Sequence, residues 1–333
     1  MSDVGLAQSE QIQRSKWLRV LADRARTGNL LPIIGGGLCN ELALGGNAAV
    51  IQAYATRSQP PLDGKSLAEM AQFKSLTDDA ITDTLALKED YVKFTKRRLY
   101  ELAEAARTPP ATLADVRGAL GKKSFAQVCD ALGYPGYGDK TQHPLLLLAN
   151  LDLPIYITTA YHELMELALK EAKKKYRTEY CRWHKDIEGD TVFDTDYEPT
   201  AKEPLVYHLH GVDRVPDSLV LTQDDYLTFL VACSQNVGKP TDPVNVRVRQ
   251  AVSASSLLLL GYELQEWDFR SLFWGLIVQR TKARTSLVTI QLESSAMQQQ
   301  YLEKYMGKYE FFINWRSAQV TMVALSEAVQ NDE

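Results

Sequence analysis

Short apolar runs alternate along this chain with longer stretches in which apolar residues recur every three or four positions. The short runs are rich in leucine or β-branched residues, which is typical of strands buried on both faces of a sheet. Such runs predict strands at residues 30–34, 154–159, 205–209, 257–260, 286–292 and 309–315, with a shorter one at 178–183.

The stretches between these runs carry the helical period. An amphipathic helix is expected over residues 11–26, ending at Gly28, and a terminal helix from about residue 318. Residues from about 48 to 151 look mostly helical, with one helix over 78–107 that stops at Pro109 and Pro110, and a YPGY turn at 134–137. Parallel strands joined by helices predict an α/β fold, a doubly wound (Rossmann-like) sheet. The helical stretch is then a subdomain that is inserted over the ligand crevice or serves packing alone.

Composition adds the expectation of a soluble protein forming a single domain over residues 1–333. Hydrophobic residues make up 45% and charged residues 24%, and the net charge of −5 argues against nucleic-acid binding. The apolar runs at 145–148 and 257–260 are too short to span a bilayer, and the polar start lacks a signal-peptide core. The basic run at 170–177 is expected to continue a helix with a solvated face.

The four cysteines indicate a reducing compartment, which we take to be the cytoplasm. They are scattered singly, so no CxxC pair exists and a zinc ribbon built from two such pairs is excluded. No metal site is expected. The cysteines are Cys39, Cys129, Cys181 and Cys233.

Four predicted strands end in small, polar or titratable residues. The segment LVYHLHG at 205–211 delivers His210 to a strand end, where a histidine is either structural or a general base, and Gly211 lets the chain turn away. The segment LLPIIGGGLCNEL at 30–42 turns through three glycines into a helix, which suits a phosphate or a plain tight turn. The segments ITTAYH at 157–162 and GYELQEWDFR at 261–270 follow the other two strands. Because parallel strands end at one edge of a sheet, these residues are expected to share a crevice.

In these motifs the chain resembles the Sir2-like family, in particular the NAD-cleaving branch found in bacterial antiphage defence systems, which lacks the sirtuin zinc module. The ordered motifs are PIIGGG, ITTAYH, HLHG, LTQDDY at 221–226 and GYELQEWDFR, and they span residues from about 30 to 315. The resemblance implies that His210 is the catalytic histidine. It also implies NAD-binding positions at Gly35, Gly36, Gly37, Thr158, Thr159, Tyr161, Gly211, Gly261, Tyr262 and Asp268.

Ala160 departs from the family pattern, because the second catalytic residue of the family is an asparagine at this position. An asparagine amide orients a water and holds ribose hydroxyls, and a methyl group does neither. The intact residues around Ala160 favour an Asn→Ala change in a competent enzyme over a naturally inactive relative. Glu266 and His162 stand where aspartates are usual, and we interpret both as tolerated variants.

The resemblance implies an NAD glycohydrolase that releases nicotinamide and ADP-ribose and depletes NAD during abortive infection, impaired here by Ala160. The alternatives are a non-catalytic sensor of NAD or ADP-ribose, and a protein ADP-ribosyltransferase or deacylase. The family also implies a homo-oligomer that works with a sensor or ATPase domain or a partner protein. The chain would then be the N-terminal effector region of a longer protein or one subunit of a two-protein system. No membrane partner and no direct contact with nucleic acid are expected.

Overall fold

A single parallel β-sheet organises the protein. The computed structural model describes residues 16–58, 66–107, 109–134, 136–278, 288–292 and 296–331. Within these ranges seven strands pair in the order β3-β4-β2-β1-β5-β6-β7, and every printed pair is parallel. The strands are β1 (Leu30–Ile34), β2 (Ile155–Thr158), β3 (Arg177–Tyr180), β4 (Leu205–His208), β5 (Ser256–Leu260), β6 (Val288–Gln291) and β7 (Phe311–Asn314). The predicted α/β fold is confirmed.

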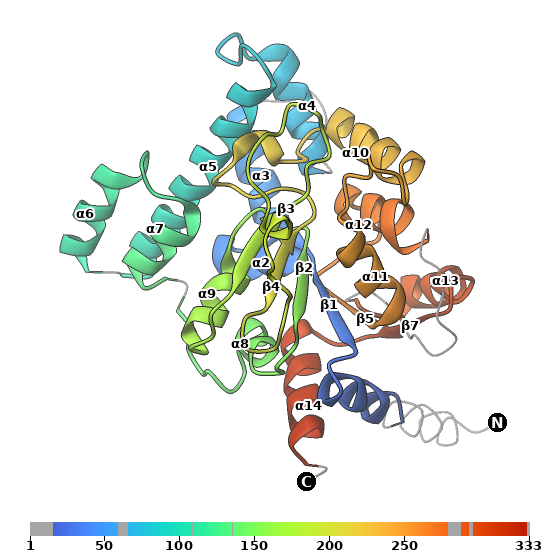
Figure 1. Cartoon of the computed structure of the whole chain (residues 1–333). Coiled ribbons are helices and arrows are strands. Elements are labelled where there is room, and N and C mark those ends of the chain that lie inside the picture. Colours follow the sequence, from blue (N-terminus) through green and yellow to red (C-terminus); the bar gives the residue numbers. More distant parts are fainter. Residues whose placement is uncertain are drawn as a thin grey trace.

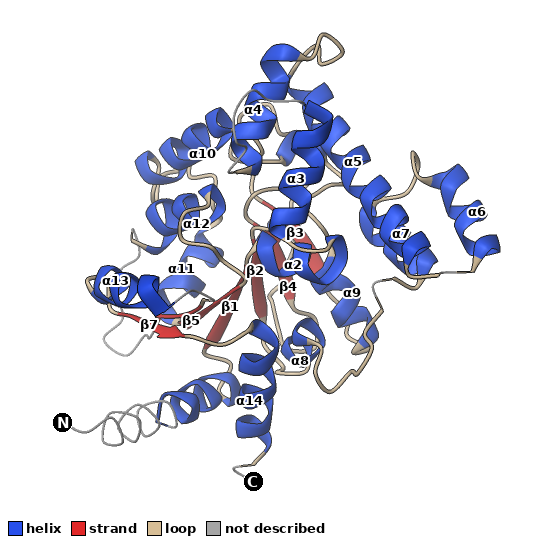
Figure 2. Ribbon diagram, turned by 180° about the vertical axis from the view of Figure 1, so that it is seen from behind, coloured by secondary structure: helices blue, strands red, loops and turns tan. Residues whose placement is uncertain are grey.

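Helices cover both faces of this sheet (Figures 1 and 2). Between β1 and β2 lie α2 (Gly36–Leu44), α3 (Asn47–Ser58), α4 (Leu67–Thr77), α5 (Thr84–Ala105), α6 (Pro110–Ala119), α7 (Phe125–Leu132) and α8 (Pro144–Ala149). After β2 come α9 (Leu164–Glu171), α10 (Gln223–Gln235), α11 (Val246–Ala254), α12 (Trp267–Leu272), the π-helical turn η3 (Phe273–Ile277), α13 (Ala296–Gly307) and α14 (Ala318–Gln330). Figure 1 shows α6 and α7 at one side of the molecule and α10 to α13 at the other.

Two hydrophobic clusters fill the space between sheet and helices. In β1, Leu30 and Ile34 belong to the cluster shared with α2, α5, α8 and α9. Leu31 and Ile33 belong to the other cluster, shared with α10, α12 and η3. Successive side chains of a strand point to opposite faces, so an unbroken apolar run is buried on both. This is why the short apolar runs located the strands correctly.

Several predicted boundaries were wrong, each for a local reason. The helix predicted over 78–107 begins at Thr84, because Asp83 is extended and its side chain accepts a hydrogen bond from the Ala86 N–H. Pro110 occupies the first position of α6, where the missing N–H costs nothing, and so starts a helix. The basic run does not continue a helix: α9 ends at Glu171, and Arg177 begins β3.

Several predictions fall partly outside the described residues. The amphipathic helix is helical over residues 16–26, and residues 11–15 lie outside. Residue 135 of the expected turn and residues 286–287 of the expected strand also lie outside. No helix in the described ranges is long and apolar enough to cross a membrane.

The strand order places a crevice above β1. The chain leaves β1 through α2, and the two neighbours of β1 in the sheet are β2 on one side and β5 on the other. The carboxyl ends of open α/β sheets bind ligands where strand order reverses in this way. The site is therefore expected beside the ends of β1, β2, β4 and β5.

Candidate functional site

A small cavity of about 60 Å³ lies at these strand ends. Six of the predicted site residues line it: Gly36, Gly37, Thr159, Ala160, Tyr161 and Asp268. The helical stretch between β1 and β2 contributes further lining residues, among them Asn47, Leu67 and Tyr91. The structure therefore brings half of the predicted positions together around one cavity. Helices between β1 and β2 form another part of its wall.

The remaining predicted positions lie behind this lining. Gly35, Thr158, His210, Gly211, Gly261 and Tyr262 do not line the cavity. Gly35, Thr158, Gly261 and Tyr262 hold the strand ends in place.

The glycines allow backbone segments to approach one another closely. A Cβ atom on Gly35 or Gly37 would lie 2.4 or 2.6 Å from the carbonyl oxygen of Gly261. Gly261 itself has a φ of +73°, and a Cβ there would lie 2.3 Å from the Cβ of Leu38. The turn after β1 is thus packed against the turn after β5, which explains the glycines without any ligand.

Gly36 is different, because its built Cβ meets only the Asp268 carboxylate, at 3.8 Å. Its N–H opens α2 and hydrogen-bonds to Asp268, and the Thr159 side chain bonds the same carboxyl group. A carboxyl group therefore already occupies the N-terminus of α2, where the helix dipole favours its ionised form.

Burial keeps the carboxyl groups of this cavity partly protonated. Desolvation raises the pKa of Asp268 to about 7, although the hydrogen bonds from Phe269 and Gly36 oppose the rise. Desolvation, followed by the charge of Asp268, raises the pKa of Glu266 to about 7 as well. Near neutral pH the cavity thus carries less negative charge than its two carboxyl groups suggest.

Thr158 and Thr159 fix the end of β2. The Thr158 hydroxyl donates to the Ile34 carbonyl at 3.1 Å and accepts from the Ala160 N–H at 3.0 Å. The Thr159 hydroxyl lies 3.1 Å from the Tyr262 hydroxyl. Thr158 therefore has a structural role here, while Thr159 faces the cavity.

Tyr161 joins the cavity wall to the loop after β4. Its hydroxyl donates to the Val220 carbonyl at 2.5 Å. Its ring meets Tyr91 edge-on, with 5.7 Å between centroids. This contact couples the helical stretch to the strand ends.

His210 is fully buried behind the cavity. Its ring meets Tyr226 and Phe229 edge-on, at 5.4 and 5.0 Å, and Tyr226 lines the cavity. Burial lowers the pKa of His210 to about 3. The ring is therefore neutral at neutral pH, which is the protonation state a general base requires.

Ser271 sets the tautomer of His210. The Ser271 hydroxyl donates its one proton to the Asp268 carbonyl at 3.1 Å, so its oxygen must accept from His210 Nε2, 3.0 Å away. Nε2 then carries the ring proton and Nδ1 the lone pair. Nδ1 is buried without a hydrogen-bond partner among the described residues.

His208, two residues earlier, is held in the opposite state. Its Nδ1 donates to the Ala160 carbonyl at 3.0 Å, and its Nε2 lies 2.9 Å from Glu166 Oε1. Burial alone lowers the pKa of His208, but the charge of Glu166 and the hydrogen bond to it outweigh burial and raise it. His208 thus favours the imidazolium form, and its Nδ1–H fixes the carbonyl of Ala160.

His162 also lines the cavity. Its ring stacks on Phe125 at 3.7 Å, and burial lowers its pKa to about 3. A neutral imidazole stacked on a phenyl ring packs α7 against the strand ends.

Among the described residues no group of histidine, cysteine, aspartate and glutamate side chains is arranged to hold a metal ion. All four cysteines are buried and unpaired.

Comparison with known proteins identifies one stretch of the chain. Residues 154–309 match the family model of the SIR2-like domain. No curated protein matches the sequence significantly. The matched stretch holds β2, β4, β5 and His210, while the turn at Gly35 to Gly37 precedes it. Residues 154–309 are therefore what this chain shares with SIR2-like domains, a family that binds NAD and includes NAD-dependent enzymes.

Proposed function

We propose that this chain is an NAD glycohydrolase of the SIR2-like family, whose activity is reduced by alanine at position 160. The observation that carries the proposal is the convergence of Gly36, Thr159, Ala160 and Asp268 on one cavity at the switch point of a doubly wound sheet. Two of the strands that build this cavity lie in the stretch that matches SIR2-like domains.

The N-terminus of α2 is the place for the NAD diphosphate. Its Gly36 N–H bonds to the Asp268 carboxyl group in the closed cavity, and an incoming phosphate would take the place of this group. Protonation of Asp268 and Glu266, both with pKa values of about 7, would lessen repulsion of an incoming phosphate.

NAD binding requires the cavity to widen. Its volume of about 60 Å³ is far below the ~300 to ~1,000 Å³ typical of small-molecule sites. The wall facing the strand ends comes from α3, α4 and α5, through Asn47, Leu67 and Tyr91. Displacement of these helices from α12 would open the crevice along its length.

The reaction proposed is hydrolysis of the bond between the nicotinamide nitrogen and the ribose carbon. The bonding pair leaves with nicotinamide and neutralises its positive charge, while water attacks the ribose carbon. His210 does not line the closed cavity, so widening of the crevice must first expose its Nδ1. The lone pair of Nδ1 then accepts the proton of that water, directly or through a ribose hydroxyl. The products are nicotinamide, ADP-ribose and a proton.

In this scheme Ala160 lowers the rate. Ala160 lines the cavity at the position of the family asparagine. Loss of one polar contact to a transition state lowers a rate by ~10²- to ~10³-fold. We further propose that the enzyme depletes NAD in antiviral defence and becomes active on assembly with itself or with a partner protein.

The test is release of nicotinamide from NAD by this chain and by Ala160→Asn, with partner proteins supplied. Turnover that rises by at least ~10²-fold in Ala160→Asn, with free ADP-ribose as product, supports the proposal. ADP-ribose attached to protein would indicate a transferase instead.

A second function, sensing of NAD or ADP-ribose without cleavage, is favoured by Ala160 and by the narrow cavity. It is supported if both proteins bind NAD and neither releases nicotinamide.

A further inference from the structure

Four aromatic rings follow one another at the edge of the sheet formed by β7. They belong to Trp274 of η3, to Tyr301 and Tyr305 of α13, and to Tyr309 in the turn before β7. Neighbouring ring centroids lie 6.2 Å apart between Trp274 and Tyr309, 5.8 Å between Tyr309 and Tyr305, and 6.2 Å between Tyr305 and Tyr301. We call this row of four rings the aromatic stripe.

The two ends of the aromatic stripe are its most exposed parts. Trp274 is 42% exposed and Tyr301 is 67% exposed, while Tyr305 and Tyr309 between them are half-buried. Single apolar side chains at a surface are ordinary, but a contiguous row of rings is typical of a surface that contacts a partner.

The spacing of residues in α13 places lysines beside these rings. Tyr301, Lys304 and Tyr305 are three or four positions apart and share one face of the helix, and Lys308 directly follows the helix. Both lysines are exposed. Met306 turns the other way and is buried in the core, so the helix is held against the sheet while this face stays in water.

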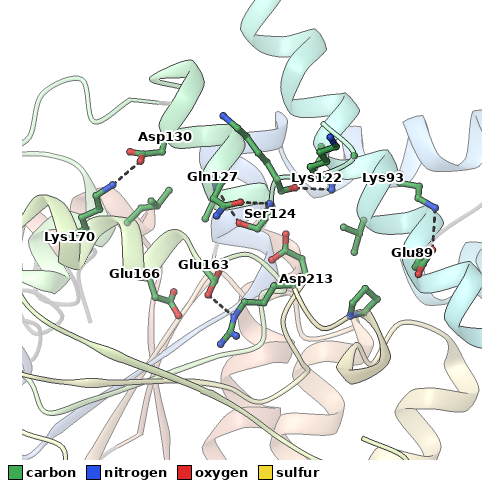
Figure 3. A pocket seen from close by; sticks show the side chains of 18 of the residues that line it. Glu89, Lys93, Lys122, Ser124, Gln127, Asp130, Glu163, Glu166, Lys170 and Asp213 are labelled. Carbon is green, nitrogen blue, oxygen red and sulfur yellow. Dashed lines mark hydrogen bonds and ion pairs between the residues drawn. The ribbon is translucent and has the colours of Figure 1, made fainter. Parts of the chain in front are cut away.

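The two lysines have no ion-pair partner among the residues that the structure describes. Lys304 and Lys308 therefore keep a full positive charge next to exposed rings. Figure 3 shows the contrast in a pocket lined by α5 and α7, on the other side of the molecule, where Lys93 pairs with Glu89 at 3.2 Å. The charge beside the aromatic stripe is thus available to a partner.

Arg270 adds a third cation near the centre of the aromatic stripe. Desolvation and the neighbouring tyrosines raise the pKa of Tyr305, and the charge of Arg270 opposes this rise, which places the guanidinium close to the phenol. Arg270 acts in the same direction on Glu266, whose pKa is raised by desolvation. Arg270 is therefore shared between the aromatic stripe and the site already described, and the two lysines carry the argument.

Acidic residues near the aromatic stripe do not cancel its charge. The nearest in sequence are Glu303 and Glu310. Glu303 is directed to Trp315, whose Nε1 donates to its carboxylate at 2.9 Å. The net charge of −5 argues against a nucleic-acid surface over the whole molecule, but it does not bear on one locally positive row of rings.

Exposed rings flanked by unpaired lysines suit a single-stranded nucleic acid better than a protein. Bases stack on tyrosine and tryptophan rings, and lysines neutralise the phosphates of the same strand. Protein interfaces are also rich in tyrosine and tryptophan, but lysine is depleted in them. The lysines therefore decide between the two kinds of partner.

We propose that the aromatic stripe binds single-stranded nucleic acid, with bases on Trp274 and Tyr301 and phosphates on Lys304 and Lys308. The row runs from η3 to α13, so an extended strand meets several rings in turn. This surface is separate from the cavity at the strand ends and goes beyond the proposed cleavage of NAD.

The test is fluorescence anisotropy of the full chain with a labelled strand of about 15 nucleotides. Oligothymidylate and oligouridylate distinguish DNA from RNA. An abasic strand of equal length is the matched control, because it keeps the phosphates and lacks the bases. The tighter of the two base-bearing strands should bind at least ~5-fold more tightly than the abasic strand, the ratio expected for one stacked base.

Tyr301→Ala is the decisive variant for stacking. It removes the most exposed ring of the aromatic stripe and leaves the core intact. We expect the affinity for the base-bearing strand to fall by ~5-fold to ~100-fold and that for the abasic strand to stay the same. Leu76→Ala is the control, because Leu76 is 77% exposed and belongs to α4, outside the aromatic stripe. Circular dichroism on heating establishes that both variants fold.

The lysines are tested through the salt dependence of binding. Lys304→Gln combined with Lys308→Gln should reduce the slope of log affinity against log salt concentration by ~0.7 for each lysine. Lys185→Gln combined with Lys202→Gln is the control. It removes the same charge from exposed positions between β3 and β4, at the opposite edge of the sheet from β7, and should leave the slope unchanged.

The proposal is overturned if no strand binds, if the abasic strand binds as tightly as the others, or if Tyr301→Ala leaves the affinity unchanged. Equal slopes for the two pairs of lysine variants would also overturn it. Dissociation of an oligomer by Tyr301→Ala, without binding of any strand, would make the aromatic stripe a protein interface instead. None of these measurements depends on NAD cleavage, so failure here leaves the proposed enzyme activity untouched.

Discussion

His208 and His210 leave the same strand end, both with no exposed surface, and yet the two regions around them hold opposite charge states. Glu166 and the Ala160 carbonyl surround His208 with acceptors, so its pKa is raised. Around His210 lie Tyr226, Phe229 and Ser271, none of them charged, and its pKa falls to about 3. Burial is equal in the two regions, so the partner decides the charge.

This difference in hydrogen bonding and charge indicates different roles for the two histidines at this strand end. A histidine whose two ring nitrogens both form hydrogen bonds is suited to holding the backbone in place. His208 does this through its hydrogen bond to the Ala160 carbonyl. A neutral histidine with one free nitrogen is suited to taking a proton, and His210 Nδ1 is free. The same contrast assigns His208 to the protein scaffold and His210 to the proposed reaction.

The largest effect should come from breaking the His208 region with Glu166→Gln. Removing one partner of a buried ion pair costs ~3 to ~5 kcal/mol, because the other charge stays buried and uncompensated. We expect the free energy of unfolding to fall by that amount in urea titrations. A loss below ~1 kcal/mol would show that His208 is neutral in the folded protein.

A smaller effect is expected from Gly211→Ala, which disturbs the His210 region alone. Gly211 has a φ of +86°, and an added Cβ would lie 2.1 Å from the Ser218 carbonyl oxygen. The positive φ and the clash together should cost about 2 to 4 kcal/mol. Gly28→Ala is the matched control, because Gly28 also has a positive φ, of +68°, but has no atom within 4 Å of a built Cβ. Equal losses of stability in the two variants would remove the argument for close packing behind His210.

The pH dependence of stability should sharpen the contrast, because the two histidines act in opposite directions. The raised pKa of His208 means that its contribution is complete below about pH 6.5, the unfolded value, and is lost as pH rises through the folded pKa. The pKa of His210 is lowered to about 3. The neutral ring therefore contributes its full stability above about pH 6.5, and this contribution is lost as the pH falls toward 3.

Unfolding free energies measured against pH for the chain and for Glu166→Gln isolate the first effect. The difference between the two curves should shrink at alkaline pH, as His208 loses its proton. Carboxyl groups such as Asp268 affect both proteins alike and cancel in this difference. A difference that grows with pH would contradict a charged His208.

The smallest effect on stability is expected from Ser271→Ala. Loss of a neutral hydrogen bond should cost about 1 kcal/mol. The specific readout is nitrogen-15 NMR of His210, which should show the proton on Nε2 in the chain and a mixture of tautomers in Ser271→Ala. Retention of a single Nε2–H tautomer in the variant would show that Ser271 does not set it.

The sequence predicted the fold because strands buried on both faces need unbroken apolar runs, as at 30–34 and 257–260. It missed the start of α5 because residues 78–83 read as helical by pattern, while the Asp83 side chain caps the helix. It could not place Asn47 or Tyr91 in the cavity wall, since only tertiary packing brings α3 and α5 over β1.

The sequence predicted which residues lie at the strand ends, but it did not predict the contacts behind them. Motif order located Gly36, Thr159, Ala160 and Asp268, because parallel strands end at one edge. Nothing local showed that His210 would lie behind Tyr226, or that Ser271 would bond to it.

The central claim is that His210 serves NAD cleavage at these strand ends. Nicotinamide release by Ala160→Asn, compared with Ala160→Asn carrying His210→Ala, tests it most directly. We expect the second change to lower turnover by at least ~10²-fold, the order of a general base, while NAD binding is retained. Equal turnover in the two proteins would contradict the account and leave His210 as a buried structural residue.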